Sequence, residues 1–399
     1  MNSVTFLCHP FHRGGVTRWM VEAADEFANQ GYSTSLVTVV PNGFISASGR
    51  PTMTDLLNEY KDIKVLTKSV DLTFELGIQS YRELVYYSLV VKNIPKGTPI
   101  ILSDDASVWG AGKLLSKDYP IIGVLHSDDP AYYYLHNRYK TFLASVIAVS
   151  YRIKRNISDD NIKVIPCGIK MADFPIKVEE SSFLKLIWVG RIEEKQKRVS
   201  DIARIGNELN NRGVKFKWSI VGHGDDTELL QMIDKFGLNK QFEFTGWLDK
   251  IEILKLMADS DILVLTSNYE GMPIVVMEGL NMGLGVVSSK VSGVEDITEH
   301  DEAHRIVRLY DIGDTESAVE NIISLKVSLD SDKREEAKQI AAELYSIENC
   351  IKKYIDVFKH MKSFGNEEVS KFNTISLIIN NIFSLIISKL RYLKYRVTS

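Results

Sequence analysis

The stretch ILVLTSNYEGMPIVVMEGLN, residues 262–281, decides the expected fold of this 399-residue chain. Its first five residues form an apolar run that reads as a buried β-strand, and a short turn follows it. Pro273 suits the first position of a helix, which we predict over residues 274–281. A strand followed at once by a helix is half of a βαβ unit, and ligands of such sheets bind at the carboxyl ends of the strands.

The same alternation of short β-rich runs and helical stretches extends in both directions, which implies parallel βαβ units and doubly wound sheets. An amphipathic helix over residues 16–29 follows the first strand, and Gly31 can end it. The predicted strands are 4–8, 35–40, 63–66, 100–103, 121–125 and 146–149 in the first half, and 184–189, 216–221, 242–245, 262–266 and 285–288 in the second half.

This rhythm changes around residues 166–184, where turn-forming and polar residues indicate a linker. We therefore expect an α/β protein with two Rossmann-like, doubly wound domains that face a central cleft. A helix near the end either closes the second domain or crosses back to the first. The expected parts are a first domain at 1–168, a linker at 169–184, a second domain at 185–345, the closing or crossover helix at 346–362, and a basic amphipathic tail at 363–399.

The composition excludes several classes of protein. The chain is 45% hydrophobic and 25% charged, as soluble globular proteins are, and its net charge of −4 argues against a nucleic-acid partner. Cys8, Cys167 and Cys350 are far apart and form no C-x-x-C pair, which excludes a disulfide framework and a cysteine zinc site and suits a reducing cytoplasm. Residues 1–7 lack the features of a secretory leader, and no apolar run is long enough to span a membrane.

The tail differs from the rest of the chain in composition. Residues 369–399 contain no acidic residue and five basic ones, and isoleucines and leucines recur there at helical spacing. Such a helix can lie in a membrane interface, with its basic residues drawn to anionic lipid. The alternative is a C-terminal helix packed on this protein or on a partner.

Two carboxylates stand out at the carboxyl end of the strand quoted above. Glu270 lies in the loop, and Glu278 lies eight residues on, in the following helix. A carboxylate accepts two hydroxyl hydrogen bonds, which is what a sugar or a ribose diol requires. The alternatives are a turn or capping residue for Glu270 and a solvent-facing residue for Glu278.

Glycines and basic residues follow two other predicted strands. Gly14 and Gly15 lie between the first strand and the first helix, where backbone N–H groups favour an anion. This is not a G-x-G-x-x-G motif, and no acidic residue ends the second strand, so a dehydrogenase is disfavoured. In the second half, Gly190, Arg191 and Lys197 could hold two phosphates. An ordinary tight turn and a solvated charge run are the respective alternatives.

Weaker signals lie at three further places. His126 ends a predicted strand of the first half, Gly222 and His223 end one of the second half, and Gly293 precedes an expected helix start. A structural histidine and ordinary turns are the alternatives for these residues.

As a set, in this order and spacing, these residues resemble a retaining glycosyltransferase of family four, one of the group 1 glycosyltransferases of cell-surface polysaccharide synthesis, which have the GT-B fold. The resemblance covers roughly residues 4–360, and its most specific part is the pair Glu270 and Glu278. Cys167 and Gly285 depart from the family pattern, which often has Asn and Pro there, but neither change removes a charged group.

The resemblance implies a role for each site residue. Arg191 and Lys197, with Lys195 as the rival lysine, would bind the donor diphosphate, and Gly15 would lend a backbone N–H to the phosphates. Glu270 would contact the donor sugar, Glu278 the ribose hydroxyls and His126 the reaction centre. The remaining donor-side positions are Gly14, Gly190, Gly222, His223, Trp247 and Leu248 (near the base), and Gly293.

The resemblance also implies a nucleotide-binding second domain, an acceptor-binding first domain, and neither a metal ion nor a cofactor. The donor would be a nucleotide diphosphate sugar, a UDP-sugar by preference and a GDP-sugar otherwise. The acceptor would be a saccharide, lipid-linked if the tail contacts an anionic membrane, and the enzyme would be cytoplasmic and peripheral on the inner face of that membrane. A nucleotide-sugar epimerase, a phosphorylase and a non-catalytic nucleotide-sugar-binding subunit are the rival interpretations.

Overall fold

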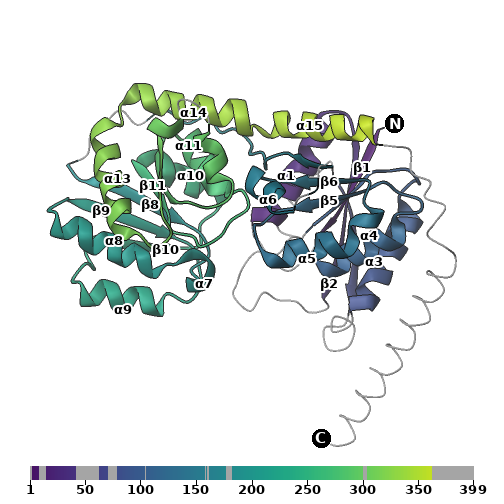
Figure 1. Cartoon of the computed structure of the whole chain (residues 1–399), viewed down its shortest axis with the longest axis horizontal. Helices are drawn as coiled ribbons and strands as arrows, with labels where there is room; N and C mark the ends of the chain where they lie inside the picture. The colour runs from purple at the N-terminus through teal and green to yellow at the C-terminus, as the bar shows by residue number, and fades with distance from the viewer. Residues whose placement is uncertain are drawn as a thin grey trace, which may run out of the picture.

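A parallel seven-stranded sheet organises the first half of the chain in the computed structural model (Figure 1). The structure describes residues 2–8, 15–41, 63–70, 79–103, 105–157, 159, 161–176, 182–299 and 303–361. The strand order is β3-β2-β1-β4-β5-β6-β7, and every neighbouring pair is parallel. The strands are β1 (Ser3–Cys8), β2 (Ser33–Pro41), β3 (Lys64–Val70), β4 (Ile100–Leu102), β5 (Ile121–Leu125), β6 (Ser145–Ala148) and β7 (Ile162–Val164). The helices among them are α1 (Gly15–Asn29), α3 (Gln79–Asn93), α4 (Ala106–Leu115), α5 (Pro130–Tyr139) and α6 (Tyr151–Ile157).

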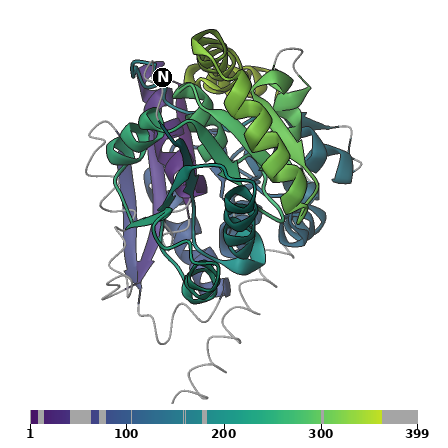
Figure 2. The same ribbon diagram turned by 90° about the vertical axis from the view of Figure 1, so that its left-hand side faces the viewer.

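A second parallel sheet of six strands has the order β10-β9-β8-β11-β12-β13. Its strands are β8 (Leu184–Val189), β9 (Phe216–Val221), β10 (Phe242–Gly246), β11 (Ile262–Leu265), β12 (Gly285–Ser289) and β13 (Val307–Tyr310). Its helices are α7 (Glu194–Lys197), α8 (Ser200–Asn211), α9 (Thr227–Lys235), α10 (Lys250–Asp259), α11 (Ile274–Asn281), α12 (Val294–Thr298), α13 (Thr315–Ser328) and α14 (Ser331–Tyr345). Figure 2 views the molecule from the end that holds this sheet. The expected α/β class with two Rossmann-like domains is confirmed.

The strand order places the functional loops. In the second sheet, β8 and β11 are neighbours although four helices and two strands separate them in the chain. The chain winds outward in one direction from β8 and in the other from β11, so the loops after these two strands diverge and leave room between them. The loops after β8 and β11 contain Gly190–Lys197 and Glu270, respectively.

Most predicted strands are confirmed to within two residues at each end, because fully apolar runs between turns read clearly as buried parallel strands. Two strands were missed: β7 and β13 are short edge strands in which Lys163 and Arg308 interrupt the few apolar residues. The prediction for Pro273 was wrong by one residue. Pro273 is the N-cap of α11, with extended backbone angles, and the helix begins at Ile274.

The terminal helix α15 (Ile347–His360) crosses back from the second domain to the first, as Figure 1 shows along the top of the molecule. Ser346 separates it from α14 and caps it, accepting a hydrogen bond from Asn349 N. Phe27 and Trp19 of α1 both contact this helix. The ring of Phe358 stacks on that of Phe27 with the ring centroids 5.5 Å apart, and the rings of Tyr354 and Trp19 have centroids 5.8 Å apart. This helix therefore completes the core of the first domain with residues from the far end of the described chain.

None of the helices among the described residues is both long enough and apolar enough to cross a membrane. The tail predicted at 363–399 lies outside the described residues.

We expect the ring of Tyr354, and not its hydroxyl, to hold α15 on the first domain. The side chain is fully buried, and its hydroxyl has no hydrogen-bond partner in the described part of the chain. Tyr354→Ala should lower the free energy of unfolding by about 3–5 kcal/mol, as for other buried aromatic truncations. Tyr354→Phe should be neutral or slightly stabilising, since it removes an unsatisfied buried hydroxyl. Urea unfolding measures both, with the exposed Lys352→Ala as control, and equal losses for the two variants would contradict the assignment.

Candidate functional site

A buried lysine–glutamate pair occupies the space where the loops after β8 and β11 diverge. Lys197 Nζ donates to Glu270 Oε1 at 2.6 Å, and the two side chains are only 13% and 10% exposed. Ser267 Oγ donates to the same carboxylate oxygen at 2.6 Å. The charges face each other in a poorly solvated place, so their interaction is stronger than that of a surface pair.

Backbone contacts between the two loops select which lysine faces Glu270. Asn268 N donates to Gln196 O at 2.7 Å, and Asn268 Nδ2 donates to Lys195 O at 2.8 Å. Thr266 Oγ1 donates to Lys197 O at 2.6 Å. These bonds fix the short helix α7 beside the end of β11, and Lys197 rather than Lys195 pairs with Glu270.

The Glu270 loop also touches the first domain. Asp128 N donates to Glu270 O at 3.0 Å, and Ser127 forms an isolated β-bridge with Gly271. A Cβ atom on Gly271 would lie 1.8 Å from His126 O, so only glycine allows this approach. The end of β5 is thereby held against the end of β11, and His126 comes close to Glu270 from the other domain.

His126 is a buried, uncharged histidine. Its side chain packs edge-on against Trp19 at 5.1 Å, and its Nδ1 lies 3.9 Å from Cys167 Sγ. Burial lowers the pKa of His126 to about 3. Its Nε2 is buried and has no hydrogen-bond partner in the described part of the chain.

Glycine contacts also bring the loops after β8 and β9 together. Gly222 has a φ of +147°, and a Cβ atom there would lie 1.8 Å from Gly190 O. Ile192 N donates to His223 O at 2.9 Å, which leaves the His223 side chain exposed. The β8 and β9 loops thus touch through backbone atoms, and no site contact of the His223 side chain is seen among the described residues.

Glu278 lies in α11 and is buried, not solvent-facing. Its Oε1 is 3.5 Å from Lys250 Nζ at the start of α10, and Lys250 Nζ also donates to Glu22 Oε1 of α1 at 2.8 Å. Burial raises the pKa of Glu22, but the charges of Lys250 and Arg18 outweigh this effect and hold the pKa below its usual value. Lys250 therefore connects the candidate ribose carboxylate with a helix of the first domain.

The other predicted positions lie around this centre. Gly15 begins α1, and a Cβ atom there would sit 3.5 Å from Ile274 Cδ1 at the start of α11, so the first turns of the two helices are neighbours. Gly293 precedes α12 and abuts Gly271 O. Arg191 is half exposed; it donates to Gln196, the residue next to Lys197, and pairs with Glu193.

Trp247 and Leu248 follow β10, the far edge strand of the second sheet. The Trp247 side chain is 37% exposed, a large apolar surface available to a planar ligand. Gly14 lies outside the described residues. Within the part of the chain that the structure describes, no group of three or more His, Cys, Asp or Glu side chains could hold a metal ion.

Sequence reasoning missed Ser267, Asp128, Glu22 and Lys250. Ser267 and Asp128 lie within three residues of predicted site residues, so their closeness along the chain was an available signal. Glu22 and Lys250 are separated by 228 positions and meet only because α1 packs near α10 and α11. No spacing in the sequence could reveal that contact.

Known proteins resemble this chain in sequence and in fold. Residues 184–326 match the family described as "Glycosyl transferases group 1". The chain is 28% identical over 158 residues to the putative colanic acid biosynthesis glycosyltransferase WcaL of Escherichia coli, covering 37% of this chain and 38% of that protein. It is 28% identical over 213 residues to the lipopolysaccharide 1,6-galactosyltransferase of the same species, covering 50% and 57%. The chain thus spans between about a third and three fifths of these relatives.

A solved structure extends the likeness to both domains. It is a mutant of Staphylococcus aureus TarM in complex with fondaparinux, α-GlcNAc-glycerol and UDP, with a TM-score of 0.72 over 90% of this chain and all of that chain. At 13% identity this likeness concerns the fold, which is GT-B. Residues 184–326 are thus similar to group 1 glycosyltransferases, and the GT-B architecture of the chain is confirmed.

The depressed pKa of His126 predicts a pH-dependent stability. Its pKa is about 3 in the folded chain and about 6.5 when unfolded, so between these values the unfolded state binds more protons. The stabilisation is complete above pH 6.5 and is lost as the pH falls toward 3. His126→Asn should flatten the slope of unfolding free energy against pH by about 1 kcal/mol per unit below pH 6.

Urea unfolding at several pH values from 4.5 to 7.5 measures that slope. His223 is exposed, so His223→Asn is the matched control, and its curve of unfolding free energy against pH should run parallel to that of the unmodified chain. The pKa of His136 is also lowered by burial, so some acid sensitivity should persist in every variant. Parallel curves for His126→Asn and His223→Asn would refute the assignment.

Proposed function

We propose that this chain is a retaining, metal-independent glycosyltransferase that moves a hexosyl group from a nucleotide diphosphate sugar, preferably a UDP-sugar, to a saccharide acceptor. One observation carries the proposal: Lys197 and Glu270 are paired in a buried place at the carboxyl ends of β8 and β11, with His126 of the first domain held against the same loop. A cation and a carboxylate side by side suit a diphosphate and a sugar that are bonded to each other.

Lys197 would stabilise the leaving group. Cleavage of the anomeric C–O bond places negative charge on the nucleoside diphosphate, and a preorganised cation lowers the barrier because it needs no rearrangement during the reaction. The hydrogen bond to Glu270 already positions Lys197. Arg191 would close over the diphosphate, and the N-terminal turn of α1 at Gly15 would add backbone N–H groups.

Glu270 and Glu278 would take the sugar and the ribose, respectively. On donor binding, the diphosphate would replace Glu270 as the partner of Lys197, and Glu270 would accept hydrogen bonds from sugar hydroxyls. Lys250 beside Glu278 keeps a positive charge next to the ribose carboxylate. Trp247 and Leu248 would lie against the base, and a GDP-sugar is the alternative donor.

The neutral state of His126 suits the reaction centre. The transition state would have oxocarbenium character, as in glycoside hydrolysis, and a nearby imidazolium would oppose its positive charge. A neutral imidazole can donate or accept a hydrogen bond to the donor sugar without that penalty. Retention of anomeric configuration is carried over from the family resemblance.

The acceptor proposal draws on relatives and on the tail. The names of the two curated relatives cite colanic acid biosynthesis and a lipopolysaccharide, and the TarM complex contains saccharide ligands and UDP. By analogy, the acceptor here would be a growing cell-surface saccharide. The basic, apolar sequence of residues 369–399 would bring the enzyme to the anionic inner face of a membrane, where a lipid-linked acceptor would lie.

The deciding experiment is a transfer assay with donor binding measured beside it. We expect UDP to raise the unfolding temperature more than GDP, ADP, CMP or dTDP, with or without magnesium, since a ligand of the folded state stabilises it. Sugar release from the matching donor should need a saccharide acceptor and should be fastest when that acceptor is lipid-linked in anionic vesicles. Conversion of the donor without an acceptor would indicate an epimerase, and binding without turnover would indicate a non-catalytic subunit.

The lysine at position 197 should carry much of the rate. Lys197→Met removes the charge next to Glu270 and should lower kcat by about 100- to 1,000-fold, in the range seen when one preorganised charge or donor is lost. Lys195→Met is the matched control, two residues away on the same short helix, and should stay within about threefold of the unmodified enzyme. Similar kcat values for the two variants would contradict the assignment of Lys197 to the leaving group.

A further inference from the structure

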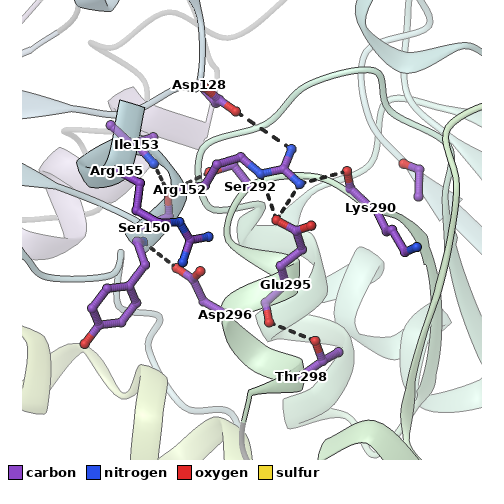
Figure 3. A network of polar contacts seen from close by, with 12 residues as sticks. Asp128, Ser150, Arg152, Ile153, Arg155, Lys290, Ser292, Glu295, Asp296 and Thr298 are labelled. Carbon is purple, nitrogen blue, oxygen red and sulfur yellow. Dashed lines mark hydrogen bonds and ion pairs between the residues drawn. The ribbon is translucent and has the colours of Figure 1, made fainter. Parts of the chain in front are cut away.

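A polar contact between α6 of the first domain and α12 of the second holds the domains together beside the candidate site (Figure 3). At its centre, the hydroxyl oxygens of Ser150 and Ser292 are 2.6 Å apart and buried. Ser292 Oγ also donates to Gly271 O at 3.1 Å, in the loop that carries Glu270. The contact is therefore continuous with the site itself.

The second domain caps α6. Tyr151 N, the first N–H of that helix, donates to Asp296 Oδ2 at 2.8 Å. The first N–H groups of a helix have no partner within it, and here an acidic side chain from the other domain supplies one. The start of α6 is thus fixed relative to α12, and this fixes the backbone position of the next residue, Arg152.

Arg152 reaches both domains with one guanidinium group. Its Nε donates to Glu295 Oε2 at 2.7 Å, and its Nη2 pairs with the same carboxylate and donates to Lys290 O at 3.3 Å. Its Nη1 lies 3.9 Å from Asp128 Oδ2 in the first domain. Figure 3 shows the guanidinium between these two carboxylates.

Asp128 belongs to the loop that positions His126. It is the second residue after His126, and its N–H donates to Glu270 O at 3.0 Å. Its Oδ1 accepts hydrogen bonds from Tyr133 Oη and, at 3.0 Å, from Asn156 Nδ2, and these bonds orient the carboxylate. Arg152 thus connects α12 with the loop that places His126 against Glu270.

We propose that Arg152 is a positioning residue, which sets the distance between the His126 and Glu270 loops by pairing with Glu295 across the domain boundary. The expected effect of Arg152 on turnover rests on the proposed function. Arg152 touches no residue to which we assign donor contact, so its loss should leave donor binding intact and slow the chemical step. Two nitrogens of the planar guanidinium contact Glu295 Oε2, and such a pair is suited to this task because it fixes orientation as well as distance.

The test exchanges the two charges. Arg152→Glu and Glu295→Arg each place like charges opposite one another and should lower kcat by roughly 100-fold, as expected for a misplacement of about 1 Å, with KM for the donor unchanged. The double exchange restores the pair and should recover at least tenfold. Recovery should be incomplete, because the new carboxylate at position 152 faces Asp128.

Arg155→Glu is the matched control. Arg155 lies one turn further along α6 and approaches Glu299 of the second domain only at 4.0 Å, with both side chains about 60% exposed. This variant should stay within about threefold of the unmodified enzyme. Equal kcat values for Arg152→Glu and Arg155→Glu, or a double exchange no faster than the single variants, would overturn the proposal.

A second measurement separates this inference from the proposed function. Spin labels at Lys117→Cys and Val327→Cys, one exposed position in each domain, report the interdomain distance without any substrate, and the native cysteines are buried. Arg152→Glu should broaden or lengthen this distance, and the double exchange should restore it. An unchanged distribution in Arg152→Glu would overturn the inference, whether or not the chain transfers sugar. If Arg152→Glu does not fold, Arg152→Gln takes its place in both measurements.

Discussion

The site depends on one close backbone contact, that of Gly271 with the carbonyl of His126. Because glycine has no Cβ atom, the loop after β11 in the second domain can lie directly against the loop after β5 in the first. The N–H of Asp128 then bonds to Glu270 O, and Ser127 pairs with Gly271. The proposed roles of His126 beside the donor sugar and of Arg152 beside Glu295 both depend on this approach.

The electrostatic arrangement around that contact is costly and is therefore informative. Burying a lysine and a glutamate removes both from water, and a buried ion pair often stabilises a protein less than well-packed apolar residues of the same size would. Apolar residues such as leucine could therefore stabilise the fold at these two positions about as well as Lys197 and Glu270 do. Their place between two diverging loops supports the proposed donor, which carries both a negative group and hydroxyls.

The extensive hydrophobic cores of the two domains offset the free energy that burying this ion pair costs. The strands of both sheets are apolar, and α15 brings aromatic rings from the end of the described chain onto α1. Parallel sheets need cover on both faces; α1 lies on the first sheet, and the crossover helix packs on α1. The same helix connects the two domains covalently and so restricts their relative position. The contacts beside the site therefore have only to adjust that position.

Much of this protein follows from its sequence. Apolar runs such as 121–125 and 262–265 read as buried strands, and their alternation with helices indicated two doubly wound domains. A residue next to such a strand end must lie at the edge where ligands bind, which is why Glu270, Arg191, Lys197 and His126 could be named in advance. Strands β7 and β13 escaped notice because their charged side chains lie on exposed or half-buried edges, where the apolar pattern is diluted.

What only the tertiary structure decided is which of these residues meet. The sequence left Lys195 and Lys197 as rivals, and the hydrogen bonds of Asn268 and Thr266 to the backbone of α7 resolved which lysine faces Glu270. It gave no sign of Lys250 between Glu22 and Glu278, or of Arg152 between Asp128 and Glu295. Local patterns encode which face of an element is buried, whereas contacts between distant elements depend on how two domains pack, and that packing has no period along the chain.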